Sequence, residues 1–287
     1  MEYPVITIDI KSANYPERLK QIGNPPRQLY CRGDISLLQT ECFGVVGTRM
    51  ITSYGKEAVQ QFVPGLARHF TIVSGLAIGI DASAHKRTLE TSGKTIAVLG
   101  SGINDKHIYP VSNQKLAHEI LENGGLITSE YKPDTKARDN MFPERNRIIS
   151  GLSKGVLIIE ADDKSGSLIT ARLAVEQNRD VFAVPGSIFS PKSRGTNQLI
   201  QRGAKLVSTL DDIIQDYSML DLKLPARNAN PTEASILAVL ETNGPLNTDE
   251  IIRHTQKEAP EIMVALSMME IKGMVRQMAN GIFRKAD

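Results

Sequence analysis

The chain has 287 residues, of which 41% are hydrophobic and 23% charged, and it carries a formal net charge of +2. This length accommodates one sizeable domain and a smaller one, and the composition is that of an ordinary globular protein. The net charge is too small to indicate a nucleic-acid partner by itself, because a nonspecific phosphate binder would be expected to carry a larger excess of positive charge.

Residues 1–42 form a lead-in to the main domain. The N-terminus lacks the basic and then apolar pattern of a signal peptide, and no apolar stretch approaches the roughly 18 residues that cross a membrane. Cys31 and Cys42 are the only cysteines and lack CxxC spacing, as expected of free thiols in a reducing cytosol. Pro25, Pro26 and weak periodicity predict a segment packed on the main domain. We expect a soluble, cytoplasmic protein that does not associate with membranes.

Short β-branched apolar runs alternate with amphipathic helical patterns over residues 43–215. The expected strands are 42–46, 71–75, 95–100, 126–130, 155–161, 181–186 and 205–208, and the expected helices are 55–70, 81–91, 113–123 and 168–178. Strands that are apolar on both faces and alternate with helices indicate a parallel sheet covered on both sides. We predict an α/β fold with a Rossmann-like, mostly parallel sheet and helices on both of its faces. Pro64 should kink or end the first helix.

The C-terminal part has a different pattern. Residues 216–230 lose periodicity and predict a linker. Helical patterns follow at 231–242, 247–254 and 260–272, and an Asn-Gly pair between short apolar runs predicts a terminal hairpin. Three helices and a hairpin predict a small winged-helix domain over residues 231–287.

That terminal domain does not have the composition of a DNA groove reader. Residues 228–287 contain six Lys/Arg and eight Asp/Glu, a net charge of −2. The third helix would offer base edges mostly Met, Glu and Leu, whereas groove recognition uses Arg, Lys, Asn or Gln. The pattern favours a protein-contact or auxiliary role.

Three motifs resemble catalytic or cofactor sites without matching them. The Gly-Lys-Thr at 93–95 follows a helix and enters a strand, which is the reverse of a phosphate-binding P-loop. The Gly-Ser-Gly at 100–102 lacks the third glycine of a dinucleotide site. Asp81 and His85 lie one turn apart on a helix and could form a dyad, but a structural role is favoured. The pattern therefore predicts no catalytic residue, cofactor or metal.

Small and polar residues follow several predicted strands. In a parallel sheet these carboxyl ends share one edge, where ligands bind, and glycines there let a ligand approach the backbone. Helix N-termini at that edge offer free N–H groups to an anion, and Ser165 is a natural N-cap. The candidates at this edge are Gly47, Thr48, Arg49, Ser74, Gly75, Ser165, Gly166 and Ser167.

The segment FPERNRIISGLS at 142–153 predicts phosphate and base contacts. Arg145 and Arg147 lie in an otherwise apolar helical run with Asn146 between them, and an exposed Phe142 precedes a proline. Arginine can bind phosphate through two hydrogen bonds, and an aromatic ring can stack on a base. An alternative is equally open: one or both arginines pair with a carboxylate, Glu130 or Glu160, and hold the sheet edge together.

The ordered motifs together resemble the DNA-processing protein A family, DprA, also called Smf. They read VVGTRMITSYG, VSGLAIGIDASAH, GKTIAVLGSGINDKHIYP, GGLITSEY, FPERNRIISGLS, EADDKSGSLITARLAVEQNRDVFAVPG and LIQRGAKLV. The lead-in NYPERLKQIGNPPRQLYCRGD is also similar, so the resemblance spans residues 14–284. Thr48 replaces the serine that the family usually has before its arginine, which keeps the hydroxyl.

The resemblance implies a single-stranded DNA-binding protein without catalytic turnover. Such proteins protect incoming strands in natural transformation, load the RecA recombinase onto them, and act as homodimers. Carried onto this chain, Arg49 would grip phosphate and Ser74 with Gly75 would line the pocket. The pocket would be flanked by Phe142, Arg145, Asn146 and Arg147, and the positive path would be extended by Lys115 and Lys192.

Two alternatives remain open. A nucleotide-binding or phosphoribohydrolase-like enzyme of a related Rossmann group would use a glutamate, and Glu176 ends the segment SGSLITARLAVE in a similar place. However, the PGGxGTxxE pattern of that group is missing. A nucleotide-sensing regulator acting through its winged helix is disfavoured by the acidic third helix.

Overall fold

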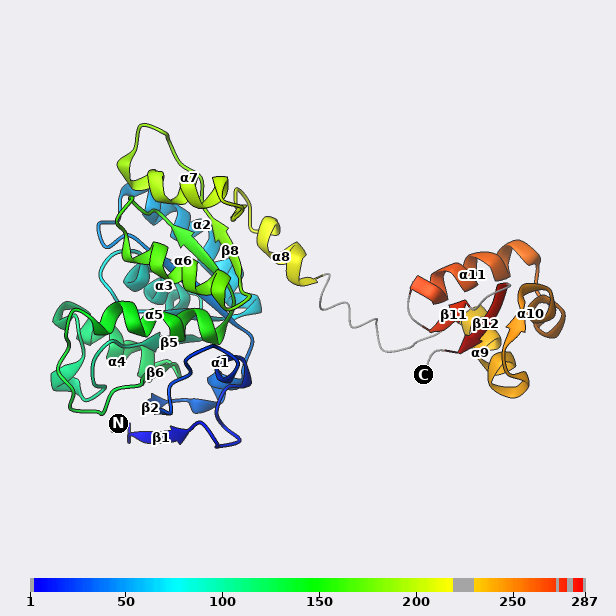
Figure 1. Ribbon diagram of the computed structural model, residues 1–287, viewed down its shortest axis with the longest axis horizontal. Helices are drawn as coiled ribbons and strands as arrows, with labels where there is room; N and C mark the ends of the chain where they lie inside the picture. Colours follow the sequence, from blue (N-terminus) through cyan, green and yellow to red (C-terminus); the bar gives the residue numbers. More distant parts are fainter. Residues whose placement is uncertain (1–2, 219–229, 272–273, 278–280, 286–287) are drawn as a thin grey trace. The chain divides into compact units, whose positions relative to one another are not determined.

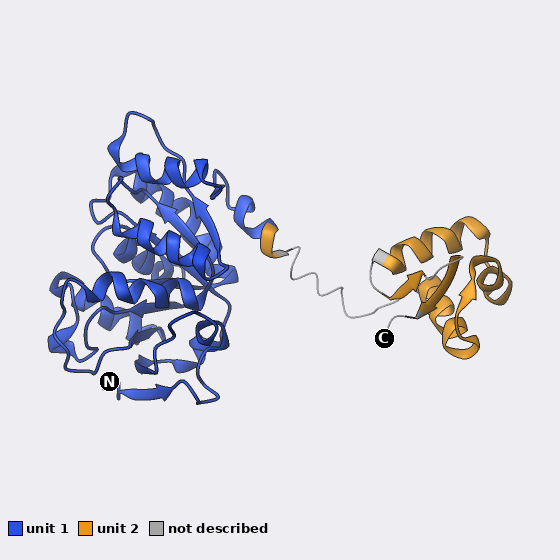
Figure 2. Cartoon of the chain, in the orientation of Figure 1, with its two compact units in different colours: residues 1–215 blue, residues 216–287 orange. Residues whose placement is uncertain are grey.

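The computed structural model describes residues 3–218, 230–271, 274–277 and 281–285 (Figure 1). The chain divides into two compact units, Met1–Gln215 and Asp216–Asp287 (Figure 2). Helix α8 (Asp211–Ser218) extends into the first residues of the predicted linker at 216–230. Most of that linker lies outside the described residues.

The first unit is built on a nine-stranded sheet with the order β1-β2-β6-β5-β4-β3-β7-β8-β9. The seven strands from β3 to β9 are parallel to their neighbours in this series. They are β3 (Cys42–Gly47), β4 (Thr71–Ser74), β5 (Thr95–Val98), β6 (Leu126–Ser129), β7 (Ser153–Ile159), β8 (Asp180–Ala183) and β9 (Lys205–Leu206). Each coincides with an expected apolar run, so the predicted α/β class is confirmed.

Helices cover both faces of this sheet, as Figure 1 shows. On β5, Ala97 packs in the cluster with α4 (Gln114–Glu122), whereas Ile96 and Val98 pack in the cluster with α5 and α6. The alternation follows from the period of two along a strand. The other helices of the unit's main body are α2 (Ser53–His69), α3 (Ile80–Glu90), α5 (Met141–Leu152), α6 (Gly166–Glu176) and α7 (Arg194–Gln201).

Pro64 was expected to kink or end α2, and the structure shows that it does not end the helix. The helix continues to His69, with Phe62, Val63 and Leu66 all buried. A proline removes only one hydrogen bond of a helix, and the burial of the apolar face on both sides of it holds the remaining turns in place.

The lead-in is part of the sheet rather than a segment packed on it. Strand β1 (Ile6–Asp9) pairs antiparallel with β2 (Gln28–Gly33), which pairs antiparallel with β6. Leu29 and Cys31 are fully buried in β2, and both cysteines of the chain are free thiols. The alternation of β2 is short and follows two prolines, so the sequence pattern did not indicate a strand.

The second unit has the predicted winged-helix elements. They are α9 (Pro231–Asn243), α10 (Thr248–Thr255), α11 (Ala259–Ile271), and an antiparallel sheet of β10 (Leu246–Asn247), β12 (Ile282–Lys285) and β11 (Val275–Gln277). Asn230 and Asn247 open α9 and α10 with capping boxes. The expected hairpin is present, while Asn280 of its turn lies outside the described residues. Within the described ranges of both units, no helix is long and apolar enough to cross a membrane.

If the lead-in is an integral part of the sheet, its core residues should contribute to the stability of the first unit. Leu29→Ala should lower the free energy of unfolding by about 2–5 kcal/mol, because a buried leucine is replaced by a cavity. Urea denaturation of the variant measures this change, with the exposed Val5→Ala as a control. A loss no larger than that of the control would show that the segment is only loosely attached.

Candidate functional site

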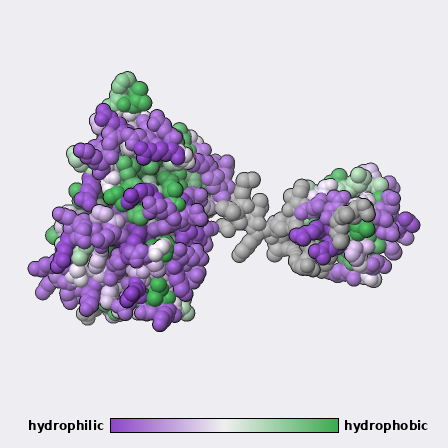
Figure 3. All heavy atoms as spheres, viewed as in Figure 1, coloured by the Kyte–Doolittle hydropathy of each residue, from purple (hydrophilic) through white to green (hydrophobic). Residues whose placement is uncertain are grey.

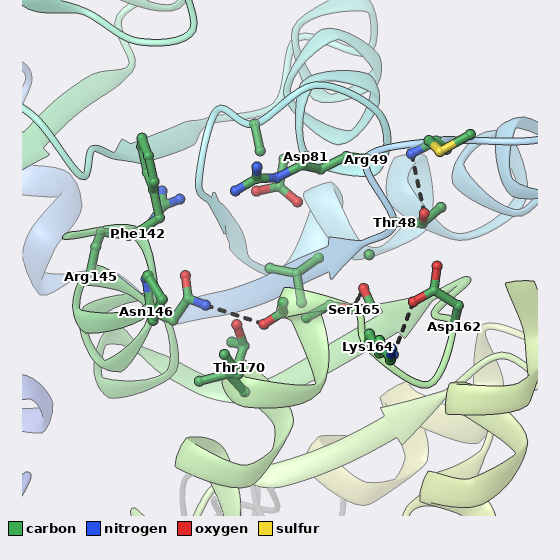
Figure 4. A pocket seen from close by; sticks show the side chains of 18 of the residues that line it. Thr48, Arg49, Asp81, Phe142, Arg145, Asn146, Asp162, Lys164, Ser165 and Thr170 are labelled. Atoms are coloured by element: carbon green, nitrogen blue, oxygen red, sulfur yellow. Dashed lines mark hydrogen bonds between the residues drawn. The ribbon is translucent and has the colours of Figure 1, made fainter. Parts of the chain in front are cut away.

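A pocket of about 480 Å³ opens at the carboxyl edge of the sheet, around the ends of β3 and β7 (Figure 4). The chain runs from β3 through β4 and β5 to β6 on one side, and then returns to β7 on the other. Loops diverge at such a topological switch point, which leaves a crevice between them. The predicted residues that line this pocket are Gly47, Thr48, Arg49, Phe142, Arg145, Asn146, Ser165, Gly166, Ser167 and Lys192.

Arg49 stands on a turn that the neighbouring elements fix. The Thr48 amide donates to the Glu160 carbonyl at 2.8 Å, and the Thr48 carbonyl accepts from the Ile80 amide at 3.1 Å. At Gly47, a Cβ atom would collide with the Ile159 carbonyl of β7, so only glycine permits this approach. Among the described residues no carboxylate lies within 4 Å of the exposed Arg49 guanidinium. This guanidinium is therefore available to an anion.

Phe142 places an aromatic ring beside that guanidinium. The Arg49 carbon Cζ lies 5.7 Å from the centre of the Phe142 ring, within the range of a cation–π contact. The Phe142 ring also packs on Tyr109 with 5.4 Å between ring centres. The sequence analysis expected this ring to be exposed, but it is half-buried because it packs on Tyr109. The packing fixes the ring at the pocket wall, where a planar group can stack on it.

The N-terminus of α6 forms another wall of the pocket. Ser165 occupies the predicted N-cap position, but its side chain makes no capping bond and its Oγ instead lies 2.8 Å from Ser167 Oγ. Nothing lies within 4 Å of a Cβ atom built on Gly166. The Asn146 side chain donates to the Gly166 carbonyl at 3.3 Å and holds α5 against this turn. Free amides at a helix N-terminus favour bound negative charge.

Three charged residues of the pocket lining were missed by the sequence analysis. Asp139 precedes α5, and Asp162 and Lys164 lie in the loop between β7 and α6. The Lys192 ammonium donates to Asp162 Oδ2 at 3.1 Å, and this bond lowers the pKa of Asp162. Lys192 therefore faces the pocket as half of an ion pair. A lysine immediately before a Ser-Gly-Ser helix start was the pattern that could have indicated Lys164.

Arg145 is in the floor of the pocket and is 4% exposed. Its guanidinium donates to the carbonyls of Gly75, at 2.6 Å, and of Val98. The Asp81 carboxylate accepts from the Gly75 amide at 3.0 Å. Burial lowers the pKa of Arg145 to about 10, and the Asp81 charge opposes this shift. Arg145 thus completes a buried hydrogen-bonded network. Its guanidinium lies so close to Gly75 that a Cβ atom at this position would collide with it.

Four predicted site residues lie outside the pocket lining. Ser74 is buried and its Oγ donates to the Val45 carbonyl at 2.6 Å, while Gly75 lies beneath Arg145. Lys115 is on α4, with a side chain 90% exposed and paired with Glu119 at 3.7 Å. The fourth is Arg147.

Arg147 confirms the ion-pair alternative. Its two terminal nitrogens donate to the two oxygens of Glu130 at 2.5 and 2.7 Å. Bidentate pairing of this kind fixes the geometry of both side chains. Glu160 pairs with neither arginine, because its carboxylate accepts from the Thr52 amide at 3.0 Å and the Thr52 hydroxyl at 2.5 Å. It thereby anchors the start of α2.

His85 has a structural environment, as favoured from the sequence. Its Nδ1 lies 2.7 Å from the hydroxyl of Thr95, the first residue of β5, and the side chain is fully buried. Burial, with a smaller effect from Arg145, lowers the pKa of His85 to about 3. The described part of the chain contains no group of three His, Cys, Asp or Glu side chains placed to hold a metal.

The sequence matches two family models. Residues 6–218 match DNA recombination-mediator protein A, and residues 221–281 match the DprA winged helix domain. A DNA processing protein DprA from Bacillus subtilis is 44% identical over 234 residues, which cover 81% of this chain and 75% of the relative. Protein Smf from Escherichia coli is 38% identical over 288 residues, which cover 96% of this chain and 76% of the relative.

Known structures of such proteins are also similar to this chain. DNA processing protein A from Streptococcus pneumoniae has a TM-score of 0.70 and 42% identity, covering 75% of each chain. The protein from Helicobacter pylori, known for its single-stranded DNA binding mode, has a TM-score of 0.67 and 34% identity. That match covers 76% of this chain and 97% of the other.

The buried network should make Arg145 a determinant of stability. Arg145→Met should lower the free energy of unfolding by about 3–5 kcal/mol, because it leaves the Asp81 carboxylate buried without its cation. The double variant Arg145→Met/Asp81→Asn should recover part of this loss in urea denaturation. If the two substitutions add independently, the guanidinium and the carboxylate are not coupled.

Stability should also depend on pH through His85. Below about pH 6.5 the unfolded chain takes up a proton on this imidazole, whereas the folded chain does so only near pH 3. Between pH 6.5 and about pH 4 the wild type should therefore lose up to about 1.4 kcal/mol per pH unit more than His85→Gln. Denaturant midpoints measured across this range test the difference. Parallel curves for the two proteins would contradict it.

Proposed function

Because the chain belongs to the DNA recombination-mediator protein A family, we propose that it binds single-stranded DNA in the pocket around Arg49. One observation carries this proposal. The Arg49 guanidinium, which has no carboxylate partner in the part of the chain that the structure describes, faces the same crevice as the fixed ring of Phe142 and the start of α6, which has no side-chain cap. These are the groups that an unpaired nucleotide requires.

The backbone phosphate is bound by Arg49, the amides at the start of α6, and Lys164. Guanidinium and helix N-terminal amides both favour a phosphate, and their contacts carry no base preference. A neighbouring base stacks on Phe142, and Asn146 lies within the same lining to meet a base edge. Bases are accessible in this way only when the strand is unpaired, which favours single strands over duplex.

The wider role follows from the family. The protein protects single strands in the cytoplasm, acts as a homodimer, and delivers the strand to the RecA recombinase without catalytic turnover. The similarity to the Helicobacter pylori protein supports the choice of single-stranded DNA as the ligand.

The hydrolase alternative has little support from the site. Glu176 is the last residue of α6, its side chain is 58% exposed, and it pairs with Arg172 at 3.7 Å. It does not line the pocket. A glutamate acting as an acid, base or nucleophile must reach the substrate, which Glu176 does not. Incubation with nucleoside monophosphates should therefore release no free base, and release would favour the enzyme.

Replacement of Arg49 tests the binding site. Arg49→Ala should weaken binding of oligo(dT) by about 1–3 kcal/mol, with a similar loss for other base sequences, because the lost contact is to phosphate. The slope of log Kd against log salt should fall by about 0.7. Fluorescence anisotropy at several salt concentrations measures both quantities.

Arg68→Ala is the matched control for this experiment. It also removes one exposed guanidinium from the surface, but Arg68 is in the last turn of α2, outside the pocket lining. Its affinity and salt slope should stay near those of the wild type. Equal losses in the two variants would mean that general surface charge, rather than this pocket, holds the strand.

A further inference from the structure

An apolar tip projects from the first unit on the loop between β8 and α7 (Figure 1). The tip consists of Ile188 and Phe189, which are 77% and 89% exposed. Figure 3 shows hydrophobic side chains at this projection, with hydrophilic side chains directly below it and a further hydrophobic area lower on the same face. An aromatic side chain this exposed gains nothing from burial within its own unit and leaves its ring face accessible to a ligand.

The backbone that carries the tip is held at its base. Gly186 exchanges two hydrogen bonds with the side chain of Asn197, at 3.2 and 3.0 Å. The Tyr54 hydroxyl donates to the Pro185 carbonyl at 2.5 Å. Nearer the tip, the Phe189 amide donates to Ser187 Oγ at 3.2 Å. The ring is thus presented on an anchored loop, which reduces the entropy lost when it binds a ligand.

The same loop also forms part of the pocket. Lys192 lines the pocket, and its carbonyl accepts from the Ala161 amide at 2.7 Å. Phe189 precedes it by three residues, a separation of at most about 11 Å. Arg194 follows, with a side chain 59% exposed. The aromatic tip therefore lies close to Lys192, which lines the pocket.

We propose that Phe189 is a second base-stacking platform, which receives an unpaired base of the same strand where it leaves the pocket past Lys192. This inference rests on the proposed function and extends the binding site by at least one nucleotide. Ile188 supports the stacked base from the side. Stacking on an aromatic face accepts every base, and cations beside the ring hold the phosphates that flank it.

A nucleic-acid base fits this tip better than a protein surface does. Two adjacent side chains offer far less than the roughly 800 Å² per partner that a stable protein interface buries. Lys192 and Arg194 follow the ring closely along the chain, where a polyanion can reach them. Each has one carboxylate neighbour, Asp162 at 3.1 Å and Asp163 at 3.9 Å, so neither requires a protein partner to balance its charge.

The test compares Phe189→Ala, Phe189→Leu and Phe189→Trp with the wild type. Binding is measured for a short oligo(dT) that fills only the pocket and a longer one that reaches the loop. Alanine and leucine should each raise Kd for the longer oligonucleotide about tenfold and leave the short one unchanged. Tryptophan should restore affinity and, as the only tryptophan of the chain, should be quenched by the longer strand. The exposed Val5→Ala beside β1, at the far edge of the sheet, is the control.

The outcomes separate this inference from the proposed function. If the wild type binds and Arg49→Ala weakens binding, but the Phe189 variants bind normally and the tryptophan is not quenched, only the stacking platform is refuted. If leucine fully restores affinity, an apolar contact replaces the stacking interaction and the inference is wrong. Loss of self-association in Phe189→Ala during sedimentation, with DNA binding unchanged, would assign the tip to a second copy. If the wild type binds no single strand, both ideas fail.

Discussion

The buried guanidinium of Arg145 is the interaction on which the site depends. It reaches from α5 to the ends of β4 and β5, where it meets the carbonyls of Gly75 and Val98. Asp81 closes the network from the start of α3. A buried charge is tolerated only when it is paired and hydrogen-bonded, so the network has few alternative arrangements. The network connects α5, the ends of β4 and β5, and the start of α3 beneath the pocket.

Several charged groups near the pocket have a partner of opposite charge within the first unit. Arg145 acts with Asp81, Arg147 with Glu130, and Lys192 with Asp162. The two charges of each pair offset each other, so the net charge of +2 says little about any one site. In the site that we propose, the attraction for phosphate is local and comes from Arg49, Lys164 and the amides at the start of α6. Such a site gains specificity from geometry rather than from a broad electrostatic field.

The fold was largely predictable because its strands are buried on both faces. Continuous apolar runs between helical patterns indicate a parallel sheet, and every such run from β3 to β9 is a strand in the structure. The two strands of the lead-in were missed, since β2 shows only a short alternation and pairs across a distant β6. At Pro64, local propensity suggested a kink or a helix end. The helix does not end there, because burial of the surrounding apolar face maintains it.

The sequence alone determined which loops meet at the carboxyl edge, because parallel strands place their ends together. It also determined the chemistry of Arg49, Phe142 and the Ser165 turn, whose residue types suit a phosphate and a base. Only the tertiary structure decided which arginine stays exposed with no carboxylate within 4 Å among the residues that the structure describes. Arg145 and Arg147 are two positions apart on one helix, yet one turns into the sheet and the other pairs with Glu130. That difference arises from carbonyls and carboxylates supplied by strands far away in the chain, and such partners are defined only after folding.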